Sequence, residues 1–379
     1  MSYRIPFGSL RIGPTAKRNV ERALLENWVS EGQNVREFEE QFSRKFGWKH
    51  AIMTSSGSTA ATVLWSAIRE LTTAGWMKRS AITPACAFVS TANSLLAAGI
   101  WPEFVDIELE TLNLDLSLAM PEIPHGRNGD PLGIQYVAQM GSPVGIDRAR
   151  EITETYGLYL VGDWCEAIGA RMNGEYAEHQ CDAVINSFYA GHLLGAGEAG
   201  VIATDDDEIA HLCRSIKCHG YGKDRRFDFV RIGYNAKTTD LAAAIALEGI
   251  ENFDSTFNER RKRRQTLIEL LRPLEEKLIL YEDHPNELSS PHAFPILIRD
   301  PDIDAMLLYD YLQNAGIECK SLFASLPTDH KAFAFLDYER GDFPIAERVG
   351  KSGLHFGIIQ SLNVDDLQYI ATTIKEFFR

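Results

Sequence analysis

Long apolar runs are missing from this 379-residue sequence. No stretch approaches the roughly 18 to 20 apolar residues that a helix needs to cross a bilayer. The first residues, MSYRIPFGSLRIG, also lack the apolar segment of a secretory signal peptide. These two absences argue against a membrane-spanning or secreted protein, and we expect a cytoplasmic one.

Cysteine is sparse and scattered. Six cysteines are present, and only Cys213 and Cys218 lie near each other in the sequence. No second close pair exists that could complete a zinc site. The pattern predicts reduced thiols, buried or half-buried, in a cytoplasmic protein without a metal centre.

Positive charge is scarce too, because 53 acidic residues outnumber 38 basic ones and the formal net charge is −15. This excess would repel nucleic acid phosphates and anionic membranes, so neither is an expected partner. It does not exclude an anionic small substrate, since a local site can oppose the global field. The one basic run, ERRKRR at 259–264, is interpreted as a solvated helix face rather than a nucleic-acid patch.

Strand and helix signals alternate through the first two thirds of the sequence. Apolar residues at helical spacing predict helices at 15–26 and 35–46. Short apolar runs predict strands, with helical segments between them: HAIMTS, SAITPA, PEFVDI, GIQYVAQ, LYLVGDW, VINSFY and GVIAT. This order predicts an α/β fold with a mainly parallel sheet covered by helices on both faces.

The pattern changes after about residue 250. A long charged helix is predicted at 253–271, followed by a strand near HAFPILI and by helices at 303–316 and 364–378. A chain of this length is too long for one compact core. We therefore predict a large domain at 1–250 and a smaller α+β domain at 251–379.

Ligands gather at the carboxyl ends of strands in such sheets, and residues 54–59 (TSSGST) lie at such an end and open a helix. Glycine permits close backbone approach, and hydroxyls with free helix N–H groups suit a phosphate. A plain helix cap with a turn glycine explains the same letters. Both interpretations stay open on these residues alone.

Asp163 ends the apolar strand LYLVGD, where an unpaired buried carboxylate would be costly. The protonated ring nitrogen of a vitamin B6 cofactor would be a suitable cationic partner. The alternative is that Asp163 only caps the next helix. Phe88 follows the strand SAITPA and could stack on a flat ring, although a lone phenylalanine is usually part of a core.

The stretch 187–200 contains G-x-G-x-x-G at Gly195, Gly197 and Gly200. A dinucleotide fingerprint must follow a strand and open a helix, but these glycines run into the strand GVIAT. We predict instead a wide loop between two strands that displays Ser187 and His192. A lone histidine is more often structural than catalytic, and that alternative stays open.

Taken together and in order, these segments resemble the DegT/DnrJ/EryC1/StrS family of sugar aminotransferases, a branch of the fold-type I B6 enzymes. The resemblance covers nearly the whole chain and rests on ordered segments with their typical spacing: NWVSEGQNVREFEEQF, SSGSTAA, TPACAFVSTANSLLAAG, PEFVDIELETLNLD, GLYLVGDWCEAIGA, NSFYAGHLLGAGEAGVIAT and RIGYNAKTTDLAAAIALEGIE. It implies an aspartate-aminotransferase-like fold with a three-layer large domain. It also implies pyridoxal 5'-phosphate (PLP) and its amine form, pyridoxamine 5'-phosphate (PMP), as cofactor.

The resemblance assigns the phosphate end of the cofactor site. Gly57, Ser58 and Ser187 would hold the cofactor phosphate. Asn235, in the GYN segment, would reach the phosphate of the neighbouring subunit. A homodimer with a shared active site is therefore the expected working unit.

The ring end of the site follows in the same way. Phe88 would stack on the cofactor ring, and Asp163 would pair with its nitrogen. Glu166 stands where the family usually has glutamine or histidine beside the ring. Trp28 and Ser30 fall in the N-terminal segment that the family associates with substrate binding.

The family pattern has a lysine where this sequence has His192, and no lysine occurs between Lys78 and Lys217. Imidazole forms no stable covalent bond with the cofactor aldehyde, so the cofactor would be held noncovalently and ordinary transamination would be lost. Histidine can still move protons near neutral pH.

The same change marks the sugar 3-dehydratases of the family. It implies PLP/PMP-dependent removal of the C3 hydroxyl from a nucleotide-linked 4-keto-6-deoxy sugar. An amino donor such as glutamate would regenerate the amine form of the cofactor.

Two alternatives stay open. One is another B6 reaction, including weak transamination, because the segment 219–235 is short, as in plain aminotransferases, and Ala199 replaces a family glycine. The other is a non-catalytic binding or regulatory descendant, which predicts that no cofactor binds. The cofactor residues look intact, and this counts against the second alternative.

Overall fold

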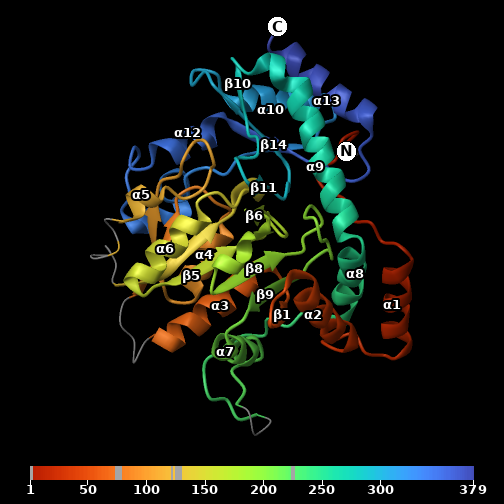
Figure 1. Ribbon diagram of the computed structural model, residues 1–379, viewed down its shortest axis with the longest axis vertical. Coiled ribbons are helices and arrows are strands. Elements are labelled where there is room, and N and C mark those ends of the chain that lie inside the picture. The colour runs from red at the N-terminus through yellow and green to blue at the C-terminus, as the bar shows by residue number, and fades with distance from the viewer. Residues whose placement is uncertain (1–2, 73–78, 121–122, 124–129, 223–226) are drawn as a thin grey trace.

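The computed structural model describes residues 3–72, 79–120, 123, 130–222 and 227–379. Its centre is a seven-stranded sheet of order β1-β9-β8-β5-β4-β2-β3 (Figure 1). The strands are β1 (His50–Thr54), β2 (Arg79–Pro84), β3 (Trp101–Val105), β4 (Asp130–Val137), β5 (Tyr159–Asp163), β8 (Ala183–Ser187) and β9 (Gly200–Thr204). Only β9 runs antiparallel to its neighbours. The predicted mainly parallel sheet is therefore confirmed.

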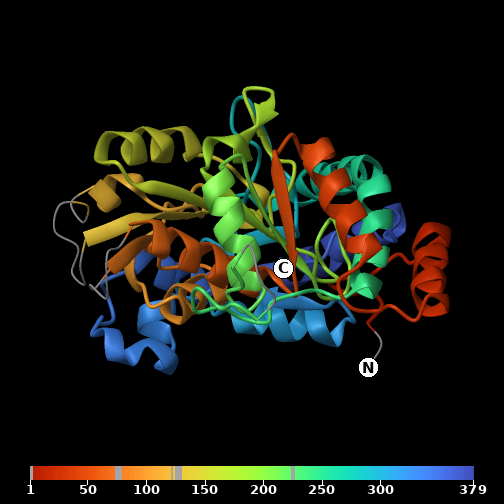
Figure 2. The same ribbon diagram turned by 90° about the horizontal axis from the view of Figure 1, so that it is seen from below.

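Helices cover both faces of this sheet (Figure 2). Met53 and Ala203 enter a hydrophobic cluster with α2, α6 and α8, whereas their neighbours Ile52 and Ile202 enter a cluster with α3, α4 and α7. Because successive side chains of a strand point to opposite faces, the two clusters are the two sides of a three-layer arrangement. The helices are α2 (Gln33–Phe46), α3 (Gly57–Thr72), α4 (Ser90–Ala97), α6 (Ile146–Tyr156), α7 (Asp207–Lys217) and α8 (Asp240–Glu251).

The C-terminal part builds a second, four-stranded antiparallel sheet of order β10-β12-β14-β13. Its elements are β10 (Leu278–Leu280), β12 (Phe294–Ile298), α10 (Ala305–Asn314), β13 (Cys319–Ser321), α12 (Pro344–Ser352), β14 (Gly353–Phe356) and α13 (Val364–Phe377). Ile5, from the N-terminus, joins the core of this part and pairs with Ile317. Its α+β character agrees with the sequence, and the boundary near residue 250 stays a prediction.

Helix α9 (Phe253–Leu271) connects the two parts and runs from α8 towards α13 in Figure 1. Phe253 and Phe257 enter the core beside the large sheet, while Leu267 and Leu271 enter the C-terminal core. One side of the helix is therefore packed against both cores, while Glu259 and Lys262 in its middle stay exposed. The prediction of a solvated basic face is wrong here, because Arg260 is fully buried.

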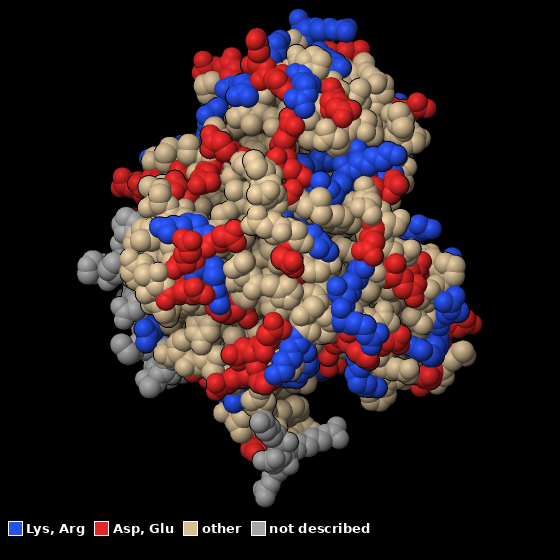
Figure 3. Space-filling model, in the orientation of Figure 1, with Lys and Arg blue, Asp and Glu red and all other residues tan. Residues whose placement is uncertain are grey.

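The remaining elements are short or peripheral: α1 (Pro14–Leu25), α5 (Leu116–Ala119), β6 (Arg171–Met172), β7 (Glu175–Tyr176), β11 (Glu287–Leu288) and α11 (Leu326–Asp329). The six cysteines are free thiols, buried or half-buried. Among the helices of the described residues, none has the length and apolar character that a bilayer crossing requires. Acidic and basic side chains are interspersed over the face shown in Figure 3.

Candidate cofactor site

A cavity of about 470 Å³ lies where strands of the large sheet end and the C-terminal sheet approaches them. Most of the residues predicted from the sequence line it together: Gly57, Ser58, Phe88, Asp163, Glu166, Ser187 and His192. They come from the segments after β1, β2, β5 and β8, as expected for a ligand site in a parallel sheet.

Ser56, Gly57 and Ser58 form one end of the cavity at the N-terminus of α3. A Cβ on Gly57 would lie 2.7 Å from the Cβ of Ser187, so only glycine allows these two segments to approach so closely. A Cβ on Gly200 would lie 2.4 Å from the carbonyl oxygen of Ser56. The first N–H groups of α3 have no partner within the helix, so this tight turn suits a phosphate.

Asp163 is the buried carboxylate of the cavity, with 6% of its surface exposed. It accepts a hydrogen bond from the backbone N–H of Cys165 at 3.1 Å. Burial raises its pKa, and no cation is among the groups that shift it. An enclosed carboxylate without a cationic partner suits a positively charged ligand atom, such as a protonated ring nitrogen.

Glu166 is a second buried carboxylate that lines the same cavity. Its Oε2 accepts a hydrogen bond from the N–H of Met140 at 2.8 Å, and its Oε1 lies 3.8 Å from Nε2 of His292. Met140 has a φ of 50°, a left-handed conformation that is strained for this residue type. Burial raises the pKa of Glu166 to about 7. Glu166 can therefore hold or release a proton near neutral pH.

His192 is half-buried and stands on the loop between β8 and β9. Its ring centroid lies 4.6 Å from that of His292, with 34° between the planes. Burial, followed by the charges of Arg260 and Lys320, lowers the pKa of His192 to about 3. His192 is therefore a neutral and weakly basic imidazole at physiological pH in the cofactor-free cavity.

Sequence reasoning missed one wall of the cavity, which is lined by Phe7, His292, Lys320, Phe323 and His355. Lys320 of β13 holds its Nζ 3.9 Å from the centroid of the Phe7 ring. No other lysine of the described residues lines this cavity. No local motif marks these residues, because they reach the cavity only when the C-terminal sheet packs against the large one.

Three predicted residues lie away from the cavity of this single chain. Asn235 forms a β-bridge with Cys218 and accepts a hydrogen bond from Nζ of Lys237 at 2.7 Å. The Trp28 side chain is 57% exposed, and Ser30 is exposed as well. Asn235 was expected to serve a neighbouring subunit, and the roles of these residues stay predictions.

The sequence model of the DegT/DnrJ/EryC1/StrS aminotransferase family matches residues 11–375. GDP-4-keto-6-deoxy-D-mannose 3-dehydratase of Yersinia pseudotuberculosis is 29% identical over 361 residues, which cover 89% of this chain and 90% of the relative. GDP-perosamine synthase of Vibrio cholerae is 26% identical, and the match covers 99% of this chain and 99% of the relative. The E. coli GDP-4-keto-6-deoxy-D-mannose-3-dehydratase with bound hydrated PLP has a TM-score of 0.86 at 25% identity, covering 98% of this chain and all of that one.

PLP fits the residues of this cavity at both ends. The glycine-dependent turn at Gly57 leaves room for a phosphate beside the start of α3. Asp163 is a buried carboxylate that no cation among the described residues pairs with, and it suits a protonated ring nitrogen. The chain therefore belongs to the DegT/DnrJ/EryC1/StrS aminotransferase family, whose members are PLP-dependent, sugar-modifying enzymes.

Proposed function

We propose that this protein removes the C3 hydroxyl from a nucleotide-linked 4-keto-6-deoxy sugar in a PLP/PMP-dependent reaction. The observation that carries the proposal is His192, a neutral imidazole that faces the cofactor cavity from a loop without lysine. The relative from Yersinia pseudotuberculosis carries the name of such a reaction. An amino donor such as glutamate completes the proposed cycle.

When bound, the amine form of the cofactor supplies an amino group for the sugar ketone and a ring that can store electrons. Gly57, Ser58 and Ser187 would hold its phosphate at one part of the cavity. Asp163 would pair with the ring nitrogen and favour its protonated form. Phe88, which lines the cavity with 55% of its surface exposed, would stack on the ring.

His192 performs the proton transfer. Its Nδ1 is enclosed and has no hydrogen-bond partner in the described part of the chain, so we assign the transfer to Nε2. The neutral ring takes a proton from the reacting carbon and returns it as the C3 hydroxyl leaves. Glu166 is a second group that can hold a proton near pH 7. The loop carries no lysine that would recapture the product covalently, so its release would fall to water.

A homodimer with a shared site is part of the proposal. Large apolar side chains are exposed on the segment before Asn235: Phe229 at 56%, Val230 at 54% and Ile232 at 75%. The segment that follows Trp28 lies next to this region, because Lys217 contacts both. Its Nζ lies 3.1 Å from Glu31, and the carbonyl of Lys217 accepts a hydrogen bond from the N–H of Ala236. Residues 223–226 of the short segment lie outside the described part. Exposed apolar surface of this kind favours a subunit contact.

Transamination is the second candidate, favoured by the similarity to GDP-perosamine synthase. It would require an amine other than that of a lysine at position 192, and Lys320 is the lysine that lines the cavity. A non-catalytic role is disfavoured, because Gly57, Asp163 and His192 meet in one cavity.

The test is an absorption spectrum of the purified protein with PLP, then with glutamate, followed by borohydride treatment and dialysis. We expect a PLP band that glutamate converts to the PMP band, and a cofactor that dialysis removes even after borohydride. Turnover of a nucleotide-linked 4-keto-6-deoxy sugar to its 3-deoxy product is then assayed directly. A borohydride-fixed cofactor, located on Lys320 by mass spectrometry, would contradict the dehydratase. Absence of any cofactor binding would leave the non-catalytic role.

A further inference from the structure

Arg260 is a buried cation that no carboxylate among the described residues pairs with. Its side chain is fully buried in the middle of α9. Burial, followed by the charge of Arg263, lowers its pKa to about 10, so it remains charged at neutral pH, and no acidic group offsets this shift. Burying an unpaired charge is costly. Such a residue is expected only where its hydrogen bonds serve another purpose.

The guanidinium group of Arg260 binds backbone oxygens on either side of the cavity wall. Nη1 donates to the carbonyls of Gly191 at 3.0 Å and of His292 at 2.9 Å. Nη2 donates to the carbonyl of His192 at 3.2 Å and to Oε1 of Gln360 at 3.4 Å. One planar group therefore joins the β8–β9 loop of the large sheet to the segment that enters β12.

These hydrogen bonds fix the backbone of His192 relative to that of His292. The carbonyls of His192 and His292 accept hydrogen bonds from the same guanidinium, and their rings lie close together, with centroids 4.6 Å apart and planes tilted by 34°. On the other side of the loop, a Cβ on Gly8 would lie only 2.8 Å from Cα of Gly191. The loop is therefore packed between the N-terminal segment and Arg260. The rigid fork of arginine suits this task, whereas lysine offers only a point charge.

We propose that Arg260 is the positioning residue of His192: its guanidinium group fixes the loop carbonyls so that the imidazole, backed by the ring of His292, is presented to the reacting carbon. The inference rests on the proposed function, because it takes His192 as the group that moves the proton. Small displacements of such a group slow proton transfer strongly.

The charge of Arg260 has a second effect on His192. The charged and titratable groups around His192 come from every neighbouring element: Arg260, Lys320, His292, Tyr189, Glu166 and Glu198, with Arg11, Glu248 and Glu259 in a polar cavity on its other side. Burial lowers the pKa of His192 most, and Arg260 and Lys320 lower it further. Removal of the Arg260 charge therefore raises the pKa of His192.

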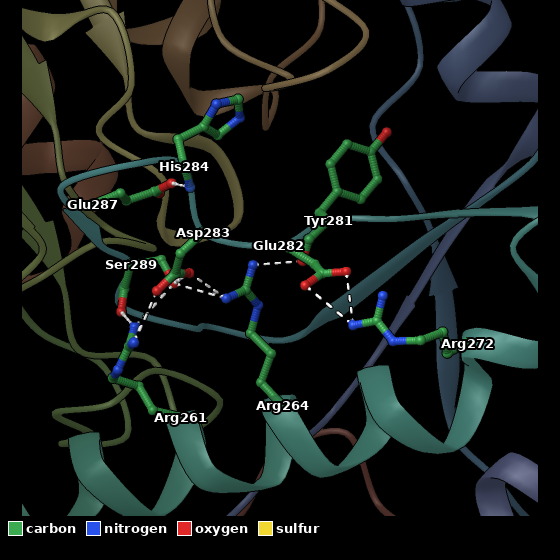
Figure 4. A network of polar contacts seen from close by, with 9 residues as sticks. All are labelled: Arg261, Arg264, Arg272, Tyr281, Glu282, Asp283, His284, Glu287 and Ser289. Carbon is green, nitrogen blue, oxygen red and sulfur yellow. Dashed lines mark hydrogen bonds and ion pairs between the residues drawn. The ribbon is translucent and has the colours of Figure 1, made fainter.

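The experiment separates charge from geometry with the variants Arg260→Met and Arg260→Lys. Arg264→Met is the matched control, because Arg264 lies one helical turn away and is neutralised by Asp283 (Figure 4). The first readout is an NMR titration of histidine-labelled, PLP-free protein, in which His192 is assigned by its loss in His192→Asn. The midpoint of His192 should rise by about one pH unit or more in Arg260→Met. It should stay unchanged in Arg260→Lys and Arg264→Met.

The second readout is the rate at which glutamate converts bound PLP. Both Arg260 variants should be slower by about tenfold or more, because both lose the planar fork, while Arg264→Met keeps the parental rate. A parental titration in Arg260→Met, or parental conversion in Arg260→Lys, would overturn the proposal. If Arg260→Met does not fold, Arg260→Lys decides by its conversion rate. If the unmodified protein does not convert PLP at all, the proposed function fails, and the titration still decides the placement of Arg260.

Discussion

Neighbouring arginines of α9 differ in how their charge is compensated: Arg261 and Arg264 are paired with a carboxylate, whereas Arg260 is not. Arg261 and Arg264 share Asp283, which also accepts a hydrogen bond from Ser289 at 2.6 Å (Figure 4). Burial alone would raise the pKa of Asp283, but the Ser289 bond and the two arginine charges outweigh it and lower that pKa. In the described part of the chain, the hydrogen-bond partners of Arg260 are neutral oxygens.

The difference separates a structural contact from a functional one. Both arginines of the Asp283 cluster are paired with its carboxylate, and the cluster ties α9 to residues 281–289. Around His192, by contrast, the charges of Arg260, Glu166 and Asp163 are enclosed without ion pairs of ordinary hydrogen-bonding length. Enclosed, uncompensated charge is typical of sites that are completed by a ligand. The cavity is therefore held at a cost in stability that the Asp283 cluster does not carry.

The largest expected effect is that of His192→Asn. Loss of the proton-transfer group should slow glutamate-driven conversion of PLP by about 10² to 10⁴-fold. The PLP band itself should remain, because Asp163 and the Gly57 turn are untouched. Ser289→Ala, the matched change in the Asp283 cluster, should convert PLP at the parental rate. Equal rates of PLP conversion in His192→Asn and Ser289→Ala would show that the cavity and the Asp283 cluster do not differ in function. The measurement is a time course of the absorption spectrum.

Glu166→Gln should change the pH dependence of stability in the PLP-free protein. The pKa of Glu166 is raised by burial from 4.5 to about 7, so its contribution is present below pH 4.5 and is lost as the pH rises through about 7. A glutamine at this position does not titrate, so the variant does not lose this stability as the pH rises. Between pH 4.5 and 8 the variant should therefore gain about 3 kcal/mol relative to the parent. Urea unfolding at pH 5 and pH 8 measures the gain, and an unchanged difference would mean that Glu166 is well solvated.

Asp283→Asn should show the opposite pH dependence. The lowered pKa of Asp283 gives stability that is present above its ordinary value of 3.8 and is lost as the pH falls through the folded value. The variant leaves Arg261 and Arg264 without a counter-charge, which should cost about 1 to 2 kcal/mol at pH 7 for this partly exposed cluster. The cost should shrink in urea unfolding below pH 3.8. A constant cost at both pH values would show that packing, rather than charge, holds the cluster.

The smallest effect is expected at the surface. Arg44 reaches Glu40 at 2.6 Å, but the two side chains are 72% and 71% exposed. Arg44→Ala should therefore change the unfolding free energy by no more than about 0.5 kcal/mol. The same urea titration measures it and calibrates both interior clusters. A larger loss would mean that exposed ion pairs contribute more in this protein than solvent screening allows.

The sequence alone predicted those parts of the fold and the site that depend on local pattern. Alternating apolar runs indicated the parallel sheet, and the charged helix at 253–271 was predicted with the bounds of α9. Gly57, Asp163 and His192 could be found because each lies at the carboxyl end of a strand or in the segment after it, and the carboxyl ends of parallel strands meet at one edge.

Only the tertiary structure decided which charges are buried and which side chains close the cavity. The letters ERRKRR read as a solvated face, yet Arg260 is fully enclosed because α9 packs between two cores. His292, Lys320 and His355 reach the site from the C-terminal sheet, far from the motifs in sequence. Periodicity reports the apolar side of a helix or strand, but the neighbours of its polar side are set by long-range packing, which no local pattern encodes.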